Sequence, residues 1–420
     1  MVLPEMALVE QIFDPQKIDD IPAEVARETE TLSLANKLKR GHTVAITAGS
    51  RGIRNIDVIT KSVVRQIKEL GGNPFIIPAM GSHGGATPEG QIKVLQKYGI
   101  SESTMGCPIR STMEVVRIGD ARDGYPVFVD RYAMEADHIV VVNRIKPHTK
   151  FEGPIESGLM KMMAIGMGNH QGAQYYHRAA ICFTFPRVIE TVATEILRRC
   201  QILFGLGVVE NAYDEICLIK ALLPEDIYDG EKALLVEAKA RMPRLPFDEI
   251  DVLIVDEIGK NISGTGMDTN VTGRNRDILG NFASTPRIKR IFVRDLTKES
   301  EGNATGIGFA DFTTSRLVNK IDRKKTYINS LAGISPEKAA IPMYFDKDIE
   351  AIEACLSTIG DIASEKSRVV HIRSTLHLNH VSVSRAFEPE LIRSQSVRRV
   401  TEWQALEVGE NGNIVSPFLK

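Results

Sequence analysis

The chain has 420 residues, of which 43% are hydrophobic and 25% are charged, and its formal net charge is -2. A chain of this length favours two or three domains with large buried cores. A charge so close to zero, with no basic stripe and no acidic tail, predicts neither a nucleic-acid nor a membrane partner, and it makes a small molecule the expected ligand.

The location of the protein is predicted from its cysteines and its N-terminus. The five cysteines are scattered, without a C-x-x-C pair or a disulfide-like framework, which indicates a reducing, cytoplasmic environment. The stretch MVLPEMALVEQIFDPQ contains acids and lacks a basic region followed by an apolar run, so no signal peptide is expected. No window approaches the length of an apolar membrane span, and no transmembrane helix is expected.

The first half of the chain alternates between strand and helix patterns. After a start expected to be irregular, residues 43–47 indicate a strand, and residues 56–70 a helix that Gly71 and Gly72 end. Residues 74–79 indicate a buried strand, residues 87–98 a helix opened by a threonine N-cap and a proline, and residues 138–143 a further strand. This order predicts a parallel sheet with crossover helices.

The second half continues the same pattern after a boundary. Helices are expected at residues 187–199 and 224–242, and the stretch RMPRLPFDEID predicts a domain boundary near Pro246. A strand and a glycine-rich loop follow, then helices at residues 311–319 and 348–357 and the strand RVVHIR. We therefore expect two α/β domains with mostly parallel, Rossmann-like sheets: a cofactor-binding domain at residues 1–246, with residues 400–420 packing back on it, and a second domain at residues 247–399. The cofactor and the substrate are expected in the cleft between them.

Three loops leave the carboxyl ends of predicted strands, where ligands bind in open α/β sheets. They carry Arg51, His83 and His148. A polar loop residue on a rigid sheet is often functional, so both histidines are acid/base candidates, although His83 also fits a role within its own glycine turn. Arg51 suits either a bidentate carboxylate contact or a surface ion pair.

The segment IKPHTKFEGPIESGLMKMMAIGMGNHQGAQYYH gathers further candidates. Lys161 lies among leucine and methionines, so its ammonium must reach solvent or serve as a nucleophile or attachment point. His170 and His177 are seven residues apart, a helical spacing that Gly172 weakens, and each is as well explained as an ordinary core or surface histidine. In the second domain, Lys260 and Asn270 lie on a glycine-rich loop that is either a substrate contact or a turn.

This spaced set resembles the nickel-dependent lactate racemase family, the 2-hydroxyacid racemases and epimerases that use a nickel-pincer nucleotide. Gly81, Ser82 and His83 match the family's G-[ST]-H loop, and His148 leads to a serine-glycine-x-x-lysine motif that ends at Lys161. His177 follows Lys161 at the family's spacing. The chain has Ala48 where the best-known members have an aspartate, which indicates a divergent member.

The resemblance implies an isomerase that moves a hydride reversibly between a 2-hydroxyacid and the cofactor. It implies that His83 and His148 are the two acid/bases, that Lys161 is joined covalently to the thioamide of the pyridinium mononucleotide, and that His177 is the nickel ligand. The remaining roles are implied more broadly: cofactor contacts for Ser50, Ser157 and Gly158, and substrate contacts for Arg51, Lys260 and Asn270. Cofactor-biosynthesis proteins would be transient partners, and a homo-oligomer is compatible with the sequence.

Two other functions are compatible with the residues. A zinc-dependent hydrolase would bind its metal through His83, His148 and His177, although it leaves Lys161 unused. A non-catalytic protein would bind an anionic metabolite through its glycine-rich loops and Arg51.

Overall fold

The computed structural model describes residues 2–50, 52–278 and 285–418. The chain forms two compact units: Asp14–Met242, and Met1–Phe13 together with Pro243–Lys420. The boundary predicted near Pro246 lies close to the observed change of unit. The first thirteen residues differ from the prediction, which assigned them to the N-terminal domain.

The unit Asp14–Met242 contains a five-stranded sheet with strand order β3-β2-β6-β7-β8 and a separate hairpin of β4 and β5. Its strands are β2 (Thr43–Ala48), β3 (Asn73–Pro78), β4 (Val115–Asp120), β5 (Pro126–Asp130), β6 (His138–Arg144), β7 (Ile202–Glu210) and β8 (Ile216–Leu222). Its helices are α1 (Ile21–Glu30), α2 (Ile56–Glu69), α3 (Pro88–Lys97), α4 (Glu102–Met105), α5 (Arg131–Glu135), α6 (Leu159–Lys161), α7 (Asn169–Phe183), α8 (Phe185–Arg199) and α9 (Ile227–Arg241).

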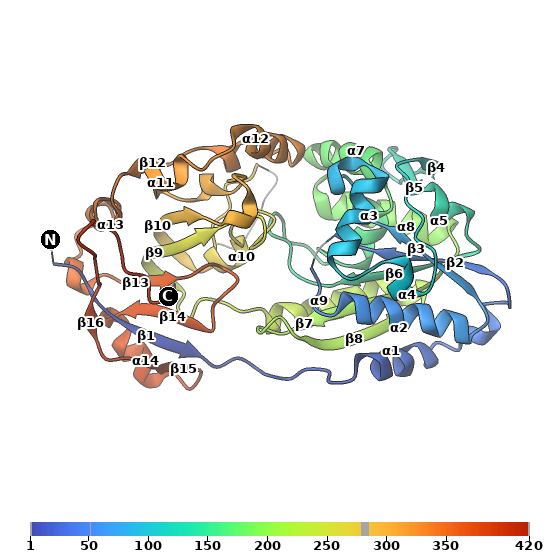
Figure 1. Ribbon diagram of the computed structural model, residues 1–420, viewed down its shortest axis with the longest axis horizontal. Coiled ribbons are helices and arrows are strands. Elements are labelled where there is room, and N and C mark those ends of the chain that lie inside the picture. Colours follow the sequence, from blue (N-terminus) through green and yellow to red (C-terminus); the bar gives the residue numbers. More distant parts are fainter. Residues whose placement is uncertain (1, 51, 279–284, 419–420) are drawn as a thin grey trace. The chain divides into compact units, whose positions relative to one another are not determined.

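Helices cover both faces of this sheet (Figure 1). Strands β3, β2, β6 and β7 run parallel, and β8 pairs antiparallel with β7 at the edge. Ile46 and Phe204 point into a core that also contains apolar residues of α1 and α2. On the other face a Cβ on Gly205 would lie 2.7 Å from Leu159, so the glycine allows α6 to lie close to the sheet. The expected α/β class with a mostly parallel sheet is confirmed.

Most predicted elements agree with the structure, and two do not. Thr87 caps α3 as expected, because its side chain accepts a hydrogen bond from the Gly90 N–H. The start of the chain is not irregular, since it contains β1 (Glu5–Gln11) and α1. The helix expected over residues 311–319 was wrong in its first half, where β11 (Phe312–Thr314) pairs parallel with β10 and only α11 (Ser315–Val318) is helical.

The second unit contains a nine-stranded sheet in the order β12-β11-β10-β9-β13-β14-β1-β15, and β16 also pairs with β1. Its further strands are β9 (Glu249–Ile258), β10 (Arg287–Leu296), β12 (Met343–Phe345), β13 (Val369–Ile372), β14 (His380–Ser384), β15 (Val397–Arg399) and β16 (Gln404–Ala405). Its further helices are α10 (Thr269–Thr272), α12 (Arg323–Ala332), α13 (Asp348–Ser357) and α14 (Glu388–Arg393).

Strand β1 explains why the first residues belong to this unit. Figure 1 shows the dark-blue β1 among the red strands of the C-terminal part. It pairs antiparallel with β14, β15 and β16, and the alternating residues Ala7 and Val9 are buried, as is Met6 on the opposite face. The tail also lies in this unit rather than in Asp14–Met242, because Leu406 and Ile414 join Met6 in its core. Backbone pairing and burial therefore hold both ends of the chain in one unit.

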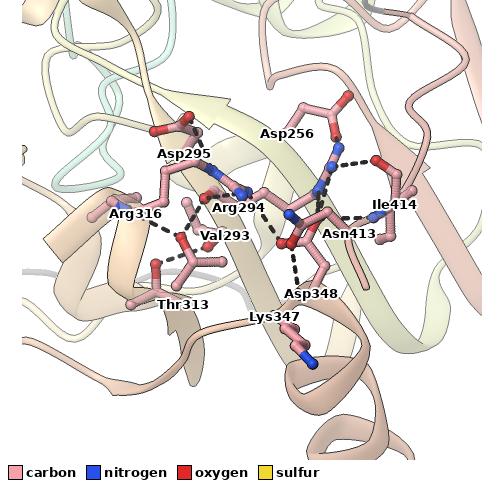
Figure 2. Close-up of polar contacts among 12 residues, drawn as sticks. Asp256, Val293, Arg294, Asp295, Thr313, Arg316, Lys347, Asp348, Asn413 and Ile414 are labelled. Atoms are coloured by element: carbon pink, nitrogen blue, oxygen red, sulfur yellow. Dashed lines mark hydrogen bonds and ion pairs between the residues drawn. The ribbon is translucent and has the colours of Figure 1, made fainter. Parts of the chain in front are cut away.

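A buried ion-pair cluster fixes the tail to the sheet (Figure 2). Arg294 of β10 pairs with Asp256 of β9 and with Asp348, the first residue of α13; both carboxylate side chains have 0% exposure. The Arg294 guanidinium donates to the Ile414 carbonyl at 2.7 Å, and Asp348 accepts from the Ile414 N–H at 3.1 Å. Burial alone would raise the pKa of Asp256, but His371 and Arg294 lower it below its ordinary value.

Replacing Arg294 should therefore destabilise this unit strongly. In Arg294→Met the carboxylates of Asp256 and Asp348 stay buried without the Arg294 guanidinium, which should cost about 3–5 kcal/mol of unfolding free energy. The exposed pair of Arg287 and Glu249 provides the control, and Arg287→Met should cost less than about 1 kcal/mol. Urea unfolding followed by circular dichroism measures both; equal losses in the two variants would contradict the assignment.

Candidate functional site

The three loops that leave β2, β3 and β6 meet within the unit Asp14–Met242. These strands are neighbours in the sheet, so their carboxyl ends lie at one edge. A π-helix, Met162–Gly166, lies against the first two loops: the Gly81 N–H donates to the Gly166 carbonyl at 3.3 Å, and a Cβ on Gly49 would lie 3.1 Å from the Met162 Cε. The described residues thus bring the predicted loops together around the turn that follows Lys161.

His83 lies in the loop that follows β3, beside the loop from β2. Its Nδ1 is 2.5 Å from the Ser50 hydroxyl, and the Tyr98 hydroxyl donates to the Ser50 carbonyl at 3.0 Å. The following Gly84 has a φ of +67°, and a Cβ there would lie 2.6 Å from the Gln91 nitrogen at the start of α3. The glycine therefore lets the histidine loop lie directly on a helix N-terminus, as only glycine can.

His148 belongs to a stack of aromatic side chains. Its ring stacks on Phe151 with a centroid distance of 4.2 Å, and Phe151 stacks on Phe185 at 5.3 Å. His177 meets the same Phe185 ring edge-on at 5.1 Å. Two histidines that are 29 positions apart in the sequence are thus joined through two phenylalanines, which also make their surroundings apolar.

Glu156 holds the His148 loop in shape. Its side chain is completely buried, and it accepts hydrogen bonds from the His148 N–H at 2.6 Å and the Gly153 N–H at 3.3 Å. Lys239 of α9 lies 2.6 Å from the same carboxylate. Burial raises the pKa of Glu156 above its ordinary value, and the contact with Lys239 opposes that rise. These contacts hold the loop in its position.

The turn that carries Lys161 lies on a buried carboxyl group, that of Glu231 in α9. Glu231 accepts from the Met160 N–H at 2.7 Å, and its Oε1 has no hydrogen-bond partner among the described residues. A Cβ on Gly158 would lie 2.2 Å from that Oε1, so this close approach requires glycine. Burial raises the pKa of Glu231 to about 7, against the lowering effect of the Met160 and Leu159 N–H groups.

Hydrogen bonds place the proton on different ring nitrogens in His148 and His177. The Nδ1 of His177 lies 2.5 Å from the Ala173 carbonyl, which can only accept, so Nδ1 carries the proton and Nε2 has the lone pair. The Nδ1 of His148 accepts from the Lys150 N–H at 3.0 Å, so the neutral ring carries its proton on Nε2. His177 is therefore arranged as a metal ligand would be, and His148 as a proton donor.

Residues 12–184 match the family model of the lactate racemase N-terminal domain. This part of the chain is therefore similar to the N-terminal domain of lactate racemases. The match covers His83, His148, Lys161 and His177.

Solved structures and curated sequences complete the comparison. The lactate racemase apoprotein from Thermoanaerobacterium thermosaccharolyticum is 14% identical with a TM-score of 0.55, over 88% of this chain and 99% of that chain. A protein from Thermotoga maritima is 16% identical with a TM-score of 0.45, over 66% and 72% of the two chains. The structural similarity to the first of these proteins supports the α/β fold described above. Comparison with curated proteins gives no match.

The remaining predicted residues lie in different parts of the chain. Ser157 and Gly158 lie at the Lys161 turn, where the Gly158 carbonyl accepts from Asn143 at 2.8 Å. Lys260 and Asn270 belong to the other unit, where Lys260 donates to the Gly264 carbonyl at 2.7 Å. Arg51 lies outside the described residues. His170 shares α7 with His177.

Two negative findings concern the residues that the structure describes. Among residues 2–50, 52–278 and 285–418, no group of three or more histidine, cysteine, aspartate or glutamate side chains is placed to hold a metal ion. The zinc-dependent hydrolase considered from the sequence needs such a group at His83, His148 and His177. Over the same residues, no helix combines the length and the hydropathy that crossing a membrane requires.

The sequence did not indicate the groups that position these side chains. Glu156 lies eight residues after His148, a spacing with no motif of its own, and Glu231 is 70 residues beyond Lys161. Phe151 and Phe185 are ordinary core residues by type. Each becomes recognisable only from its contacts. For Glu231, the chain from Lys161 passes through α7, α8, β7 and β8 before α9 brings the carboxyl group back to the turn.

The Glu231 carboxyl group predicts a pH dependence of stability. Its pKa is about 7 in the folded chain against an ordinary 4.5, so the folded state holds the proton that the unfolded state releases between these values. Stability should fall by about 3 kcal/mol as pH rises through this window. We expect Glu231→Gln to remove most of that fall in urea unfolding series at pH 5 to 8. Glu237→Gln, on the same helix but half-exposed, should keep it; a wild-type slope in Glu231→Gln would refute the assignment.

Proposed function

We propose that the chain is a racemase or epimerase of a 2-hydroxyacid, acting by reversible hydride transfer with a nickel-pincer nucleotide. The main support is that the residues singled out by the family resemblance also lie in one unit of the structure. Four residues that the family resemblance assigns to the chemistry fall inside the matched domain, and they occupy two loops and the helices α6 and α7 of a single unit. The cofactor and the substrate class come from the resemblance.

The residues present suit such a cofactor. The lone pair on the Nε2 of His177 provides one imidazole donor, a ligand that nickel accepts. One protein donor is sufficient where the nucleotide supplies the others. Lys161 would be the point of covalent attachment, on a turn fixed by Gly158 and Glu231. When bound, the nucleotide would accept and return the α-hydrogen as hydride.

His83 and His148 would each transfer the hydroxyl proton of one enantiomer. Each enantiomer presents its hydroxyl on a different side of the reacting carbon, so two proton-transfer groups are required. His83 contacts the Ser50 hydroxyl, which can donate or accept, so either nitrogen of His83 can carry the proton. His148 starts with its proton on Nε2 and becomes a base only if its bond from the Lys150 N–H is released. Phe151 and Phe185 keep water away from these steps.

Metal content and mass provide the first test. Protein produced in a host with the cofactor pathway should contain about one nickel per chain, and a peptide containing Lys161 should carry the nucleotide's mass. Lys161→Arg should lose the adduct, whereas Lys93→Arg, on the exposed side of α3, should keep it. Zinc in place of nickel, with an unmodified Lys161 peptide, would exclude the proposal.

The assignment of the bases makes a separate prediction. His83→Asn or His148→Asn in loaded protein should lower interconversion of 2-hydroxyacid enantiomers by about 10²–10⁴-fold, because each removes a positioned proton-transfer group. Nickel content should stay unchanged. His170→Asn is the control and should retain activity.

An isotope label tests the hydride step. With deuterium at C2 of the substrate, the label should stay in the product, and full exchange with solvent would contradict hydride transfer. Binding of the substrate without interconversion would favour the non-catalytic alternative.

A further inference from the structure

The side chains of Ser50 and His83 meet although they belong to two different loops, 33 positions apart. The helix α3 holds the backbones of both loops. In its first turn, the Gln91 side chain donates to the Gly81 carbonyl of the His83 loop at 3.1 Å. Directly after its last residue, the Tyr98 hydroxyl donates to the Ser50 carbonyl at 3.0 Å. The contact between the two side chains therefore rests on a fixed frame.

The backbone of His83 is also fixed from within its own loop. Its N–H donates to the Met80 carbonyl at 3.2 Å, and its carbonyl accepts from the Ala86 N–H at 3.3 Å. The His83 side chain is exposed, and exposed side chains change rotamer within nanoseconds unless a contact holds them. The approach of the Ser50 hydroxyl to the His83 Nδ1, at 2.5 Å, is a contact of this kind.

A hydroxyl suits a ring whose protonation changes, because it can both donate and accept. When His83 is a neutral base with its lone pair on Nε2, its proton lies on Nδ1 and is donated to the Ser50 oxygen. Taking up a substrate proton on Nε2 leaves that bond in place. In the other neutral tautomer the Ser50 hydroxyl donates to Nδ1 instead. The ring can therefore keep its position in all three forms.

His148 lacks this property. Its Nδ1 accepts from the Lys150 backbone N–H at 3.0 Å, and a backbone N–H can only donate. A second proton on the His148 ring would have to go to that same Nδ1, and the bond would be lost. Of the two proposed acid/bases, His83 is thus the one whose contact at Nδ1 survives a change of charge.

We propose that Ser50 is a positioning residue for His83, holding the ring by its Nδ1 in both the neutral and the charged form. Its value for catalysis rests on the proposed function. The resemblance implies a cofactor contact for Ser50, and the geometry gives its hydroxyl this role at the histidine instead.

The test is nuclear magnetic resonance of the full chain, produced with ¹⁵N-labelled histidine and without nickel or nucleotide. Spectra at pH 5 and pH 8 lie on either side of the ordinary histidine pKa of about 6.5. The signals of His83 are assigned as those that vanish in His83→Asn. Ser50→Ala should move the Nδ1 signal of His83 at both pH values, because both forms lose their partner, whereas Ser50→Thr should keep it in place. Unmoved signals in Ser50→Ala, or movement at one pH only, would overturn the assignment.

The other unit provides a matched control. There the Ser374 hydroxyl lies 3.0 Å from the Nδ1 of His377. Ser374→Ala should move the His377 signals, which shows that the spectra detect a contact between serine and histidine, and it should leave the His83 signals unchanged. Movement of the His83 signals as large as in Ser50→Ala would show that the effect does not come from the Ser50 contact.

Activity of loaded protein adds a second measurement. Ser50→Ala should lower kcat about threefold to tenfold, as expected for one hydrogen bond, with KM and nickel content unchanged, and Ser50→Thr should restore most of it. Loss of nickel from Ser50→Ala would identify a cofactor contact and contradict the positioning role. A wild-type protein without interconversion would refute the racemase proposal alone, because the spectra decide the role of Ser50 without turnover.

Discussion

The candidate site depends on close packing of one short stretch of chain, residues 158–166, against its neighbours on two sides. Gly158 brings the stretch onto the Glu231 carboxyl group of α9, where any side chain would collide. Gly166 brings its other end against the Ala79 carbonyl, where a Cβ would lie 2.8 Å away. The π-helix between them is a rare conformation that is frequent at functional sites. Lys161 lies within this stretch, so its position follows from these contacts.

Buried carboxyl groups have different roles in the two units. In Pro243–Lys420, Asp256 and Asp348 surround the guanidinium of Arg294, and the cluster fixes the tail to the sheet. In Asp14–Met242, Glu156 and Glu231 accept from the backbone N–H groups of turns. Burial raises the pKa of both glutamates, whereas the pKa of Asp256 is lowered because cations outweigh its burial. The same chemical group stabilises a chain terminus in one unit and shapes the site in the other.

The aromatic stack gives the site both its shape and its low polarity. Phe151 and Phe185 bring His148 and His177 onto one surface although they lie on a loop and on a helix. Backbone contacts then set the tautomers, since the Lys150 N–H donates to one ring and the Ala173 carbonyl accepts from the other. The two histidines thus differ in what they can do, even though the residue type is the same.

The sequence by itself determined the alternation of strand and helix, the loops at the carboxyl ends of the strands, and the spaced set of His83, His148, Lys161 and His177. These features depend on local periodicity, capping and spacing, which the chain carries in neighbouring residues. Only the tertiary structure decided that β1 joins the C-terminal unit, that Glu231 lies under the Lys161 turn, and that Phe185 joins two histidines. Those contacts connect residues far apart in the chain, and their residue types fit an ordinary core equally well. Burial and hydrogen bonding between distant segments give them their roles, and neither is written in the local sequence.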